Sequence, residues 1–98
     1  MYIPKQGDIC YMDFAPTKGH EQTGLRTAIV ISKDKFNKYT NMAIICPITT
    51  NTKKVRGSIL CEHIRSIDFN ARKLSLVEKI NEDELYEVID IINGIIEI

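Results

Sequence analysis

The sequence contains no tryptophan, only three prolines and few aromatic residues, which make up 7% of its 98 positions. No apolar run approaches about 18 residues, the length that a helix needs to span a bilayer. The N-terminus lacks the charged segment and apolar core that mark a signal peptide. Together with the short length, these absences predict one small domain over residues 1–98 that acts in the cytoplasm.

Cysteine is also scarce, and its arrangement is not that of a disulfide framework. Cys10, Cys46 and Cys61 are an odd number without a Cys-x-x-Cys pair, and each lies in or beside an apolar run. Such residues are typical of small buried side chains in a reducing compartment. The spacing of Cys61 and His63 is not that of a zinc site, so we expect no metal.

The whole chain has no net charge at pH 7, but its two halves carry charges of opposite sign. Residues 1–57 contain nine Lys or Arg and four Asp or Glu, whereas residues 58–98 contain four and nine. A basic first half suits a ligand that carries phosphate groups. The alternative explanation is that acidic residues gather on a C-terminal helix, and the sequence leaves both open.

Short runs of apolar and β-branched residues separated by polar turns predict a mainly antiparallel sheet. In the segment 33–41 lysines alternate with Phe36 and Tyr39, and this segment is expected to form a helical turn or an irregular loop. The aromatic side chains either stack on bases of a single-stranded nucleic acid or cover one end of the sheet. The strands are predicted at residues 9–14, 28–32, 42–48, 58–62 and 74–80.

The last third of the chain predicts a helix. Asn81 has the character of an N-cap, with Glu84 three residues later as its capping-box partner. Apolar residues then recur at helical spacing, and Ile91 and Ile95 widen the apolar stripe beyond one face. A stripe of this width indicates contacts both with the sheet and with a second molecule, or deep packing in a monomer. The stripe consists of Leu85, Val88, Ile89, Ile92 and Ile96.

One long polar stretch, residues 13–26, separates the first two predicted strands. Pro16, Gly19 and Gly24 indicate a loop. Most loops of this kind are solvated surface segments, but this one combines side chains that can donate protons, accept protons and bind an anion. These side chains are Lys18, His20, Glu21, Gln22 and Arg26.

Three motifs in this chain resemble those of the MazF/PemK/Kid family of toxin ribonucleases. The first is the stretch from Asp13 to Arg26, which contains Gly-His-Glu-Gln-Thr-Gly-Leu-Arg. The second is the run from Pro47 to Thr50, and the third is the run from Cys61 to Asp68. The chain departs from the family at Thr27, where proline is usual, and at Leu60, where some members have arginine. The connection between the second and third motifs is also shorter than usual.

The resemblance implies an SH3-like small barrel of the Kid/MazF/CcdB type, mainly β with a C-terminal helix. It implies a metal-independent endoribonuclease without a cofactor that cuts single-stranded RNA through attack of the 2′-hydroxyl. The expected partners are RNA, a cognate antitoxin and a second copy of the chain. The residues expected to act in catalysis are Arg26, Thr49, His20 and Glu62, and those expected to bind RNA are Lys18, Glu21, Gln22, Lys53, Lys54 and Arg56.

Two other functions remain open from the sequence. A gyrase poison of the CcdB type shares the expected fold, but such proteins depend on a tryptophan near the C-terminus that this chain lacks. A catalytically inactive SH3-like binding module is favoured by Leu60 and by the short central connection.

Overall fold

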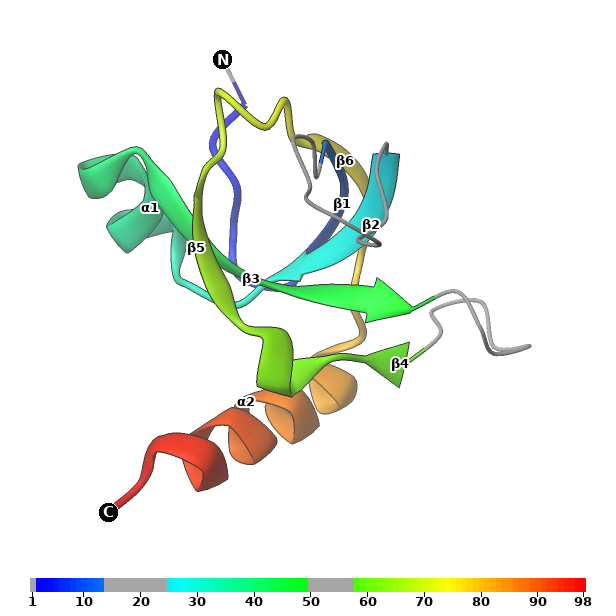
Figure 1. The fold of residues 1–98 in the computed structure, drawn as a ribbon, viewed down its shortest axis with the longest axis vertical. Coiled ribbons are helices and arrows are strands. Elements are labelled where there is room, and N and C mark those ends of the chain that lie inside the picture. Colours follow the sequence, from blue (N-terminus) through cyan, green and yellow to red (C-terminus); the bar gives the residue numbers. More distant parts are fainter. Residues whose placement is uncertain (1, 14–24, 50–57) are drawn as a thin grey trace, which may run out of the picture.

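The computed structural model describes residues 2–13, 25–49 and 58–98. The strands form a curved antiparallel sheet, and a C-terminal helix lies across one of its faces (Figure 1). The elements are, in chain order, β1 Asp8–Asp13, β2 Leu25–Val30, α1 Asp34–Thr40, β3 Met42–Thr49, β4 Ser58–Ile59, the 3-10 helix η1 Cys61–His63, β5 Arg65–Asp68, β6 Ser75–Lys79 and α2 Glu82–Ile96.

The strand order is β4-β3-β2-β1-β6, and β5 also pairs with β3. The expected mainly β fold with a C-terminal helix is therefore confirmed. The pairings among the described strands do not join β6 to β4 or β5, so the sheet is strongly bent but open. No helix in the described part of the chain is long and apolar enough to cross a membrane.

Strand β3 is the centre of the sheet because it contacts three other strands. One edge pairs with β2, while the other edge pairs with β5 over Met42–Ile45 and with β4 at Ile48 and Thr49. Pro47 lies inside this strand. Its carbonyl accepts the N–H of Leu60 at 2.8 Å. A backbone N–H at position 47 would point to the same side, where the β4 ladder ends. Because few partners lie there, the lack of this donor in proline costs little stability.

One prediction for the third motif is wrong. The strand expected over 58–62 ends at Ile59, and the chain then turns through η1. The chain continues into β5 and then into a turn over residues 69–73. The turn that follows β5 is held by Asp68, whose Oδ1 accepts the backbone N–H groups of Asn70 and Ala71, each at 3.0 Å.

Alternation along the strands builds two separate cores, one on each face of the sheet. The first core lies between the sheet and α2 and includes Ile29, Cys46, Ile48, Val88 and Ile92. The second core lies on the opposite face of the sheet and includes Met12, Ala28, Val30, Ile45 and Phe69.

The helix α2 begins where its sequence predicts. The Asn81 side chain accepts the backbone N–H of Asp83 at 2.8 Å, which satisfies one of the free donors of the first turn. Val88 and Ile92 are buried against the sheet, whereas Ile91, Ile95 and Ile96 are exposed. On β6, Leu76 and Val77 are exposed as well.

The helix α1 joins β2 to β3 and is tied to the N-terminal segment by Asn37. This side chain is fully buried and accepts the hydroxyl of Ser32. Its Nδ2 donates to the carbonyl oxygens of Pro4 at 2.8 Å and Ser32 at 3.2 Å. A single amide therefore satisfies the polar groups at the point where three segments meet.

Candidate active site

Arg26 lies in β2, one position after the strand begins. The sequence placed it in the polar loop, but the strand starts at Leu25 and pairs Arg26 with Met12 of β1. Arg26 is half-buried, while Met12 is fully buried. A cation on a paired strand has a fixed backbone, which limits the positions that its guanidinium can reach.

Thr49 ends β3 at the same end of the sheet. The last pair of the β2–β3 ladder is Ala28 with Pro47, and Arg26 and Thr49 each lie two residues beyond it. Successive side chains alternate between the faces of a strand, so Arg26 shares the face of Ala28 and Thr49 shares that of Ile45. Both of those reference residues belong to the second core. The fold therefore brings the arginine and the threonine to one face and one end of the sheet.

Glu62 lies on the other side of β3 from Arg26. It is an exposed residue of η1, which follows β4, and β4 pairs with the edge of β3 opposite to β2. Neighbouring strands are about 4.8 Å apart, so roughly 10 Å separates the strand of Arg26 from the segment that carries Glu62. Glu62 does not share a strand pair with Arg26, but both flank the strand that ends in Thr49.

The thiols next to Glu62 are protonated. Burial, followed by the nearby groups of Cys61 and Glu62, raises the pKa of Cys46 to about 12. Burial followed by the charge of Glu62 also raises the pKa of Cys61. All three cysteines are free and buried, as the sequence indicated. A thiol with a raised pKa is a poor nucleophile, so these groups act as packing residues.

Arg72 is a positioning residue that the sequence did not reveal. Its Nη1 donates to the carbonyl of Asp13 at 3.4 Å, and its own carbonyl accepts the N–H of Asp13 at 3.1 Å. These contacts hold the last residue of β1, from which the polar stretch departs. Arg72 lies in a turn almost sixty residues away in sequence and belongs to none of the three motifs, so only the fold brings it here.

The remaining predicted site residues lie outside the described part of the chain. They are His20, Lys18, Glu21, Gln22, Lys53, Lys54 and Arg56. The first four belong to the stretch that connects β1 to β2, and the last three to the stretch that connects β3 to β4. Both connections leave from the end of the sheet where Arg26 and Thr49 lie.

Comparison with protein families matches residues 5–96 to the family described as PemK-like, MazF-like toxin of type II toxin-antitoxin system. The chain is similar to the endoribonuclease toxin MazF of Escherichia coli K12, with 34% identity over 95 residues and 86% of each chain covered. It is also similar to the endoribonuclease EndoA of Bacillus subtilis 168, with 32% identity over 107 residues that cover 90% of this chain and 89% of the relative.

Solved structures show the same relationship. A crystal structure of MazF from Deinococcus radiodurans superposes with a TM-score of 0.86 at 29% identity, and the match covers 100% of both chains. A MazE–MazF crystal structure from the same organism superposes with a TM-score of 0.84 at 30% identity, covering 97% of this chain and 96% of the other. The matched family spans nearly the whole chain and includes all three motifs, so this protein belongs to the PemK-like, MazF-like toxins of type II toxin-antitoxin systems.

Proposed function

We propose that the chain is a toxin endoribonuclease that cuts single-stranded RNA at a short sequence without a metal ion. Its membership of the toxin family and its similarity to named endoribonucleases support the activity. The structural observation that carries the proposal is the placement of Arg26 and Thr49 on one face at one end of the sheet. Such an end, with a cation and a hydroxyl on the same face of neighbouring strands, suits a phosphate group.

The reaction uses the nucleophile that RNA itself provides. A base removes the proton of the 2′-hydroxyl, the 2′ oxygen attacks the adjacent phosphorus, and the bond from phosphorus to the 5′ oxygen breaks. An acid protonates the departing 5′ oxygen, so the products are a 2′,3′-cyclic phosphate and a 5′-hydroxyl. Arg26 stabilises the charge that grows on the phosphate oxygens, and the Thr49 hydroxyl donates to the same group.

His20 and Glu62 are the candidates for the two proton transfers. The imidazole of a histidine titrates near neutral pH and can take either role, and a carboxylate can serve as base. Lys18, Glu21 and Gln22 in the first connection would contact the RNA on one side. Lys53, Lys54 and Arg56 in the second connection would contact its phosphates on the other.

The activity is tested with a long unstructured RNA incubated with purified, antitoxin-free protein in excess EDTA. Discrete cuts that leave 5′-hydroxyl ends are expected, and sequencing those ends identifies the cut sequence. Intact RNA under these conditions would remove the proposal. Inhibition of gyrase in the absence of RNA cleavage would instead favour a toxin of the CcdB type.

Two partners and a location complete the proposal. The exposed isoleucines of α2 support a homodimer whose shared groove holds the RNA. Solved MazE–MazF complexes among the similar structures support a cognate antitoxin with an acidic tail that occupies this groove. Messenger RNA as substrate places the protein in the cytoplasm.

A further inference from the structure

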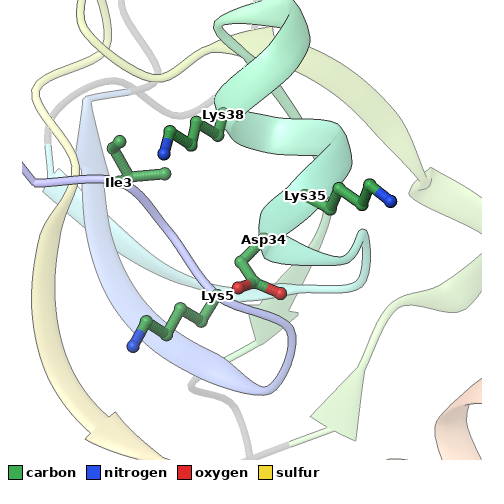
Figure 2. Close-up of a pocket in the computed structure, with 5 residues that line it drawn as sticks. All are labelled: Ile3, Lys5, Asp34, Lys35 and Lys38. Atoms are coloured by element: carbon green, nitrogen blue, oxygen red, sulfur yellow. The ribbon is translucent and has the colours of Figure 1, made fainter.

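A second basic site lies beside α1, away from Arg26 and Thr49. A cavity of about 350 Å³ opens between the N-terminal segment and this helix. It is lined by Ile3, Lys5, Asp34, Lys35 and Lys38 (Figure 2). Three of these five residues carry a positive charge and one a negative charge, so the lining is basic although the chain as a whole is neutral.

The lysines of this cavity are available for an anion. Lys5, Lys35 and Lys38 are exposed, and none of them forms an ion pair with any residue that the structure describes. Lys79 is different, because its ammonium lies 2.7 Å from the Asp8 carboxylate. Figure 2 shows the side chains of Lys5 and Lys38 extending to the same side of the cavity, whereas Lys35 extends away from it. Two unpaired cations thus share one side of the cavity.

The surroundings of the two cations favour a nucleic acid over a free anion. Ile3 contributes a half-buried apolar side chain beside the end of Lys38. Tyr39 follows Lys38 on the same helix and is 90% exposed, so the alternative that Tyr39 covers the end of the sheet is wrong. Exposed aromatic rings beside lysines are the groups that single-stranded nucleic acids use for base stacking and phosphate contacts.

The position of α1 separates this cavity from the chemistry. α1 joins the end of β2 to the start of β3, whereas Arg26 and Thr49 lie at the other end of those strands (Figure 1). Along β2, Arg26 is about 13 Å from Val30, the last residue of the strand before the chain continues to α1. The cavity is therefore too far away to contact the phosphate that is cut, but a strand of several nucleotides spans such a distance.

We infer that the cavity lined by Lys5 and Lys38 binds a backbone phosphate of the RNA substrate several nucleotides from the cut, with Tyr39 stacking on a neighbouring base. This inference rests on the proposed function, because it assigns a second contact to the same substrate. It explains why the basic half of the chain extends beyond the three motifs to the helix between β2 and β3.

The test compares two RNAs that contain the same cut sequence. One is limited to the nucleotides around the cut, and the other extends on both sides. For Lys5→Ala/Lys38→Ala we expect the KM of the long RNA to rise about tenfold with little change in kcat. The short RNA should change by less than twofold, because it does not reach α1. Lys33→Ala is the matched control, since Lys33 is an exposed lysine beside the helix that does not line the cavity.

Binding measured against salt concentration gives an independent readout. Each phosphate contact with a single strand contributes about 0.7 to the slope of log K against log salt, so the double variant, which loses one such contact, should lose about 0.7. Tyr39→Ala should weaken binding of the long RNA and leave the salt slope as it is. Melting temperatures of all variants should match the parent, because these side chains are exposed.

The outcomes separate this inference from the proposed function. Equal losses on the short and long RNA, or an unchanged salt slope, overturn the inference while cleavage by the parent upholds the function. If the parent cuts neither RNA, the function fails, and the salt slope on intact RNA still decides whether the cavity binds phosphate. Loss of antitoxin binding with normal RNA binding would make the cavity a protein-docking site and overturn the inference.

Discussion

At the scale of the residue, Arg26 combines a charged side chain with a backbone that strand pairing holds in place. The motifs indicate Arg26 and Thr49 as candidate site residues, and their catalytic roles stay predictions. The sequence placed Arg26 in a loop, whereas the structure places it within β2, opposite the buried Met12. Pairing between strands depends on residues that are distant in the chain, so a local pattern could not supply it.

Replacement of Arg26 tests its role in catalysis. For Arg26→Ala we expect the cleavage rate to fall about a hundredfold to a thousandfold, because one charge-assisted donor to the transition state is lost. Arg26→Lys should recover only part of this loss, since an ammonium cannot form the two parallel hydrogen bonds of a guanidinium. The measurement is the single-turnover cleavage rate on the RNA that contains the cut sequence.

The control for Arg26 is stability. Arg26 is half-buried, so the melting temperature should change by only a few degrees. Activity close to that of the parent would show that Arg26 is not catalytic. Loss of activity together with loss of the folded state would show that the residue supports the strand pair instead.

Asp8 is a buried carboxylate that links the N-terminal segment to β6. Its oxygens accept hydrogen bonds from the Tyr2 hydroxyl, the Lys5 N–H at 3.0 Å and the Lys79 ammonium at 2.7 Å. Burial alone raises the pKa of Asp8, but these hydrogen bonds and the charge of Lys79 together hold it below its ordinary value. The folded state therefore favours the ionised form.

This lowered pKa predicts how stability depends on pH. The stabilisation is complete above the pKa that Asp8 has in the unfolded chain, about 3.9, and it is lost as the pH falls through the lower pKa of the folded state. Asp8→Asn should cost about 2 kcal/mol at neutral pH, since hydrogen bonds to a charged group are weakened. Its loss of stability between pH 5 and pH 2 should be smaller than that of the parent in urea denaturation.

Lys79→Ala provides the comparison for Asp8. The Lys79 side chain is 62% exposed, so water replaces much of what its ion pair contributes. We expect a smaller loss of stability than for Asp8→Asn. An equal or greater loss for Lys79→Ala would mean that the pair itself, and not the buried hydrogen-bond network of Asp8, supports this edge of the sheet.

At the scale of the element, strands with clear alternation were predicted within a few residues. The third motif was not, because Cys61 turns into the first core while the backbone leaves the β4 ladder as a 3-10 turn. A continuous apolar run from Ile59 to Cys61 has no periodicity that distinguishes these conformations. The helix α2 was predicted well, since its cap and its apolar spacing are both local signals.

Asn37 carries the packing of α1 against the N-terminal segment. Asn37→Ala should cost about 2 to 3 kcal/mol, because it leaves the carbonyl of Pro4 and the hydroxyl of Ser32 without their partner in a buried position. Chemical denaturation measures this loss. Asn81→Ala is the comparison, and it should cost only about 1 kcal/mol because Asn81 caps an exposed helix end.

The same variant links stability to the cavity beside α1. The contact from Asn37 to Pro4 holds the segment that carries Ile3 and Lys5, two of the lining residues. Asn37→Ala should therefore also raise the KM of the long RNA. If stability falls and the long RNA is cut with the parent KM, the N-terminal segment keeps its place without this amide.

At the scale of the whole molecule, the opposite charges of the two halves have separate causes. The acidic half includes the first turn of α2, where Glu82, Asp83 and Glu84 face the positive end of the helix dipole. The basic half includes Arg26 and the lysines beside α1. The clustering of acidic residues on the C-terminal helix is therefore confirmed, and the binding of phosphate groups by the basic half stays a prediction.

The exposed side of α2 predicts the oligomeric state. Ile91, Ile95 and Ile96 are 54%, 56% and 67% exposed, whereas Val88 and Ile92 on the other side of the helix are buried. A domain of this size buries a small core, and a second copy would cover an apolar stripe that water otherwise solvates. We expect the parent to sediment at micromolar concentration as a dimer, with twice the chain mass of 11.2 kDa.

Charge on this stripe should separate the subunits. Ile91→Lys/Ile95→Lys places two cations in the expected interface and should give a folded monomer, because neither residue belongs to the core. Asp90→Lys is the matched control, since Asp90 is exposed on the same helix but lies outside the apolar stripe. If the RNA groove is shared between subunits, the cleavage activity of the variant should fall in proportion to its dimeric fraction. Raising the protein concentration should then restore both the dimer and the activity. A parent that sediments as a monomer would contradict the dimer, and a monomeric variant with full activity would place the whole RNA site within one chain.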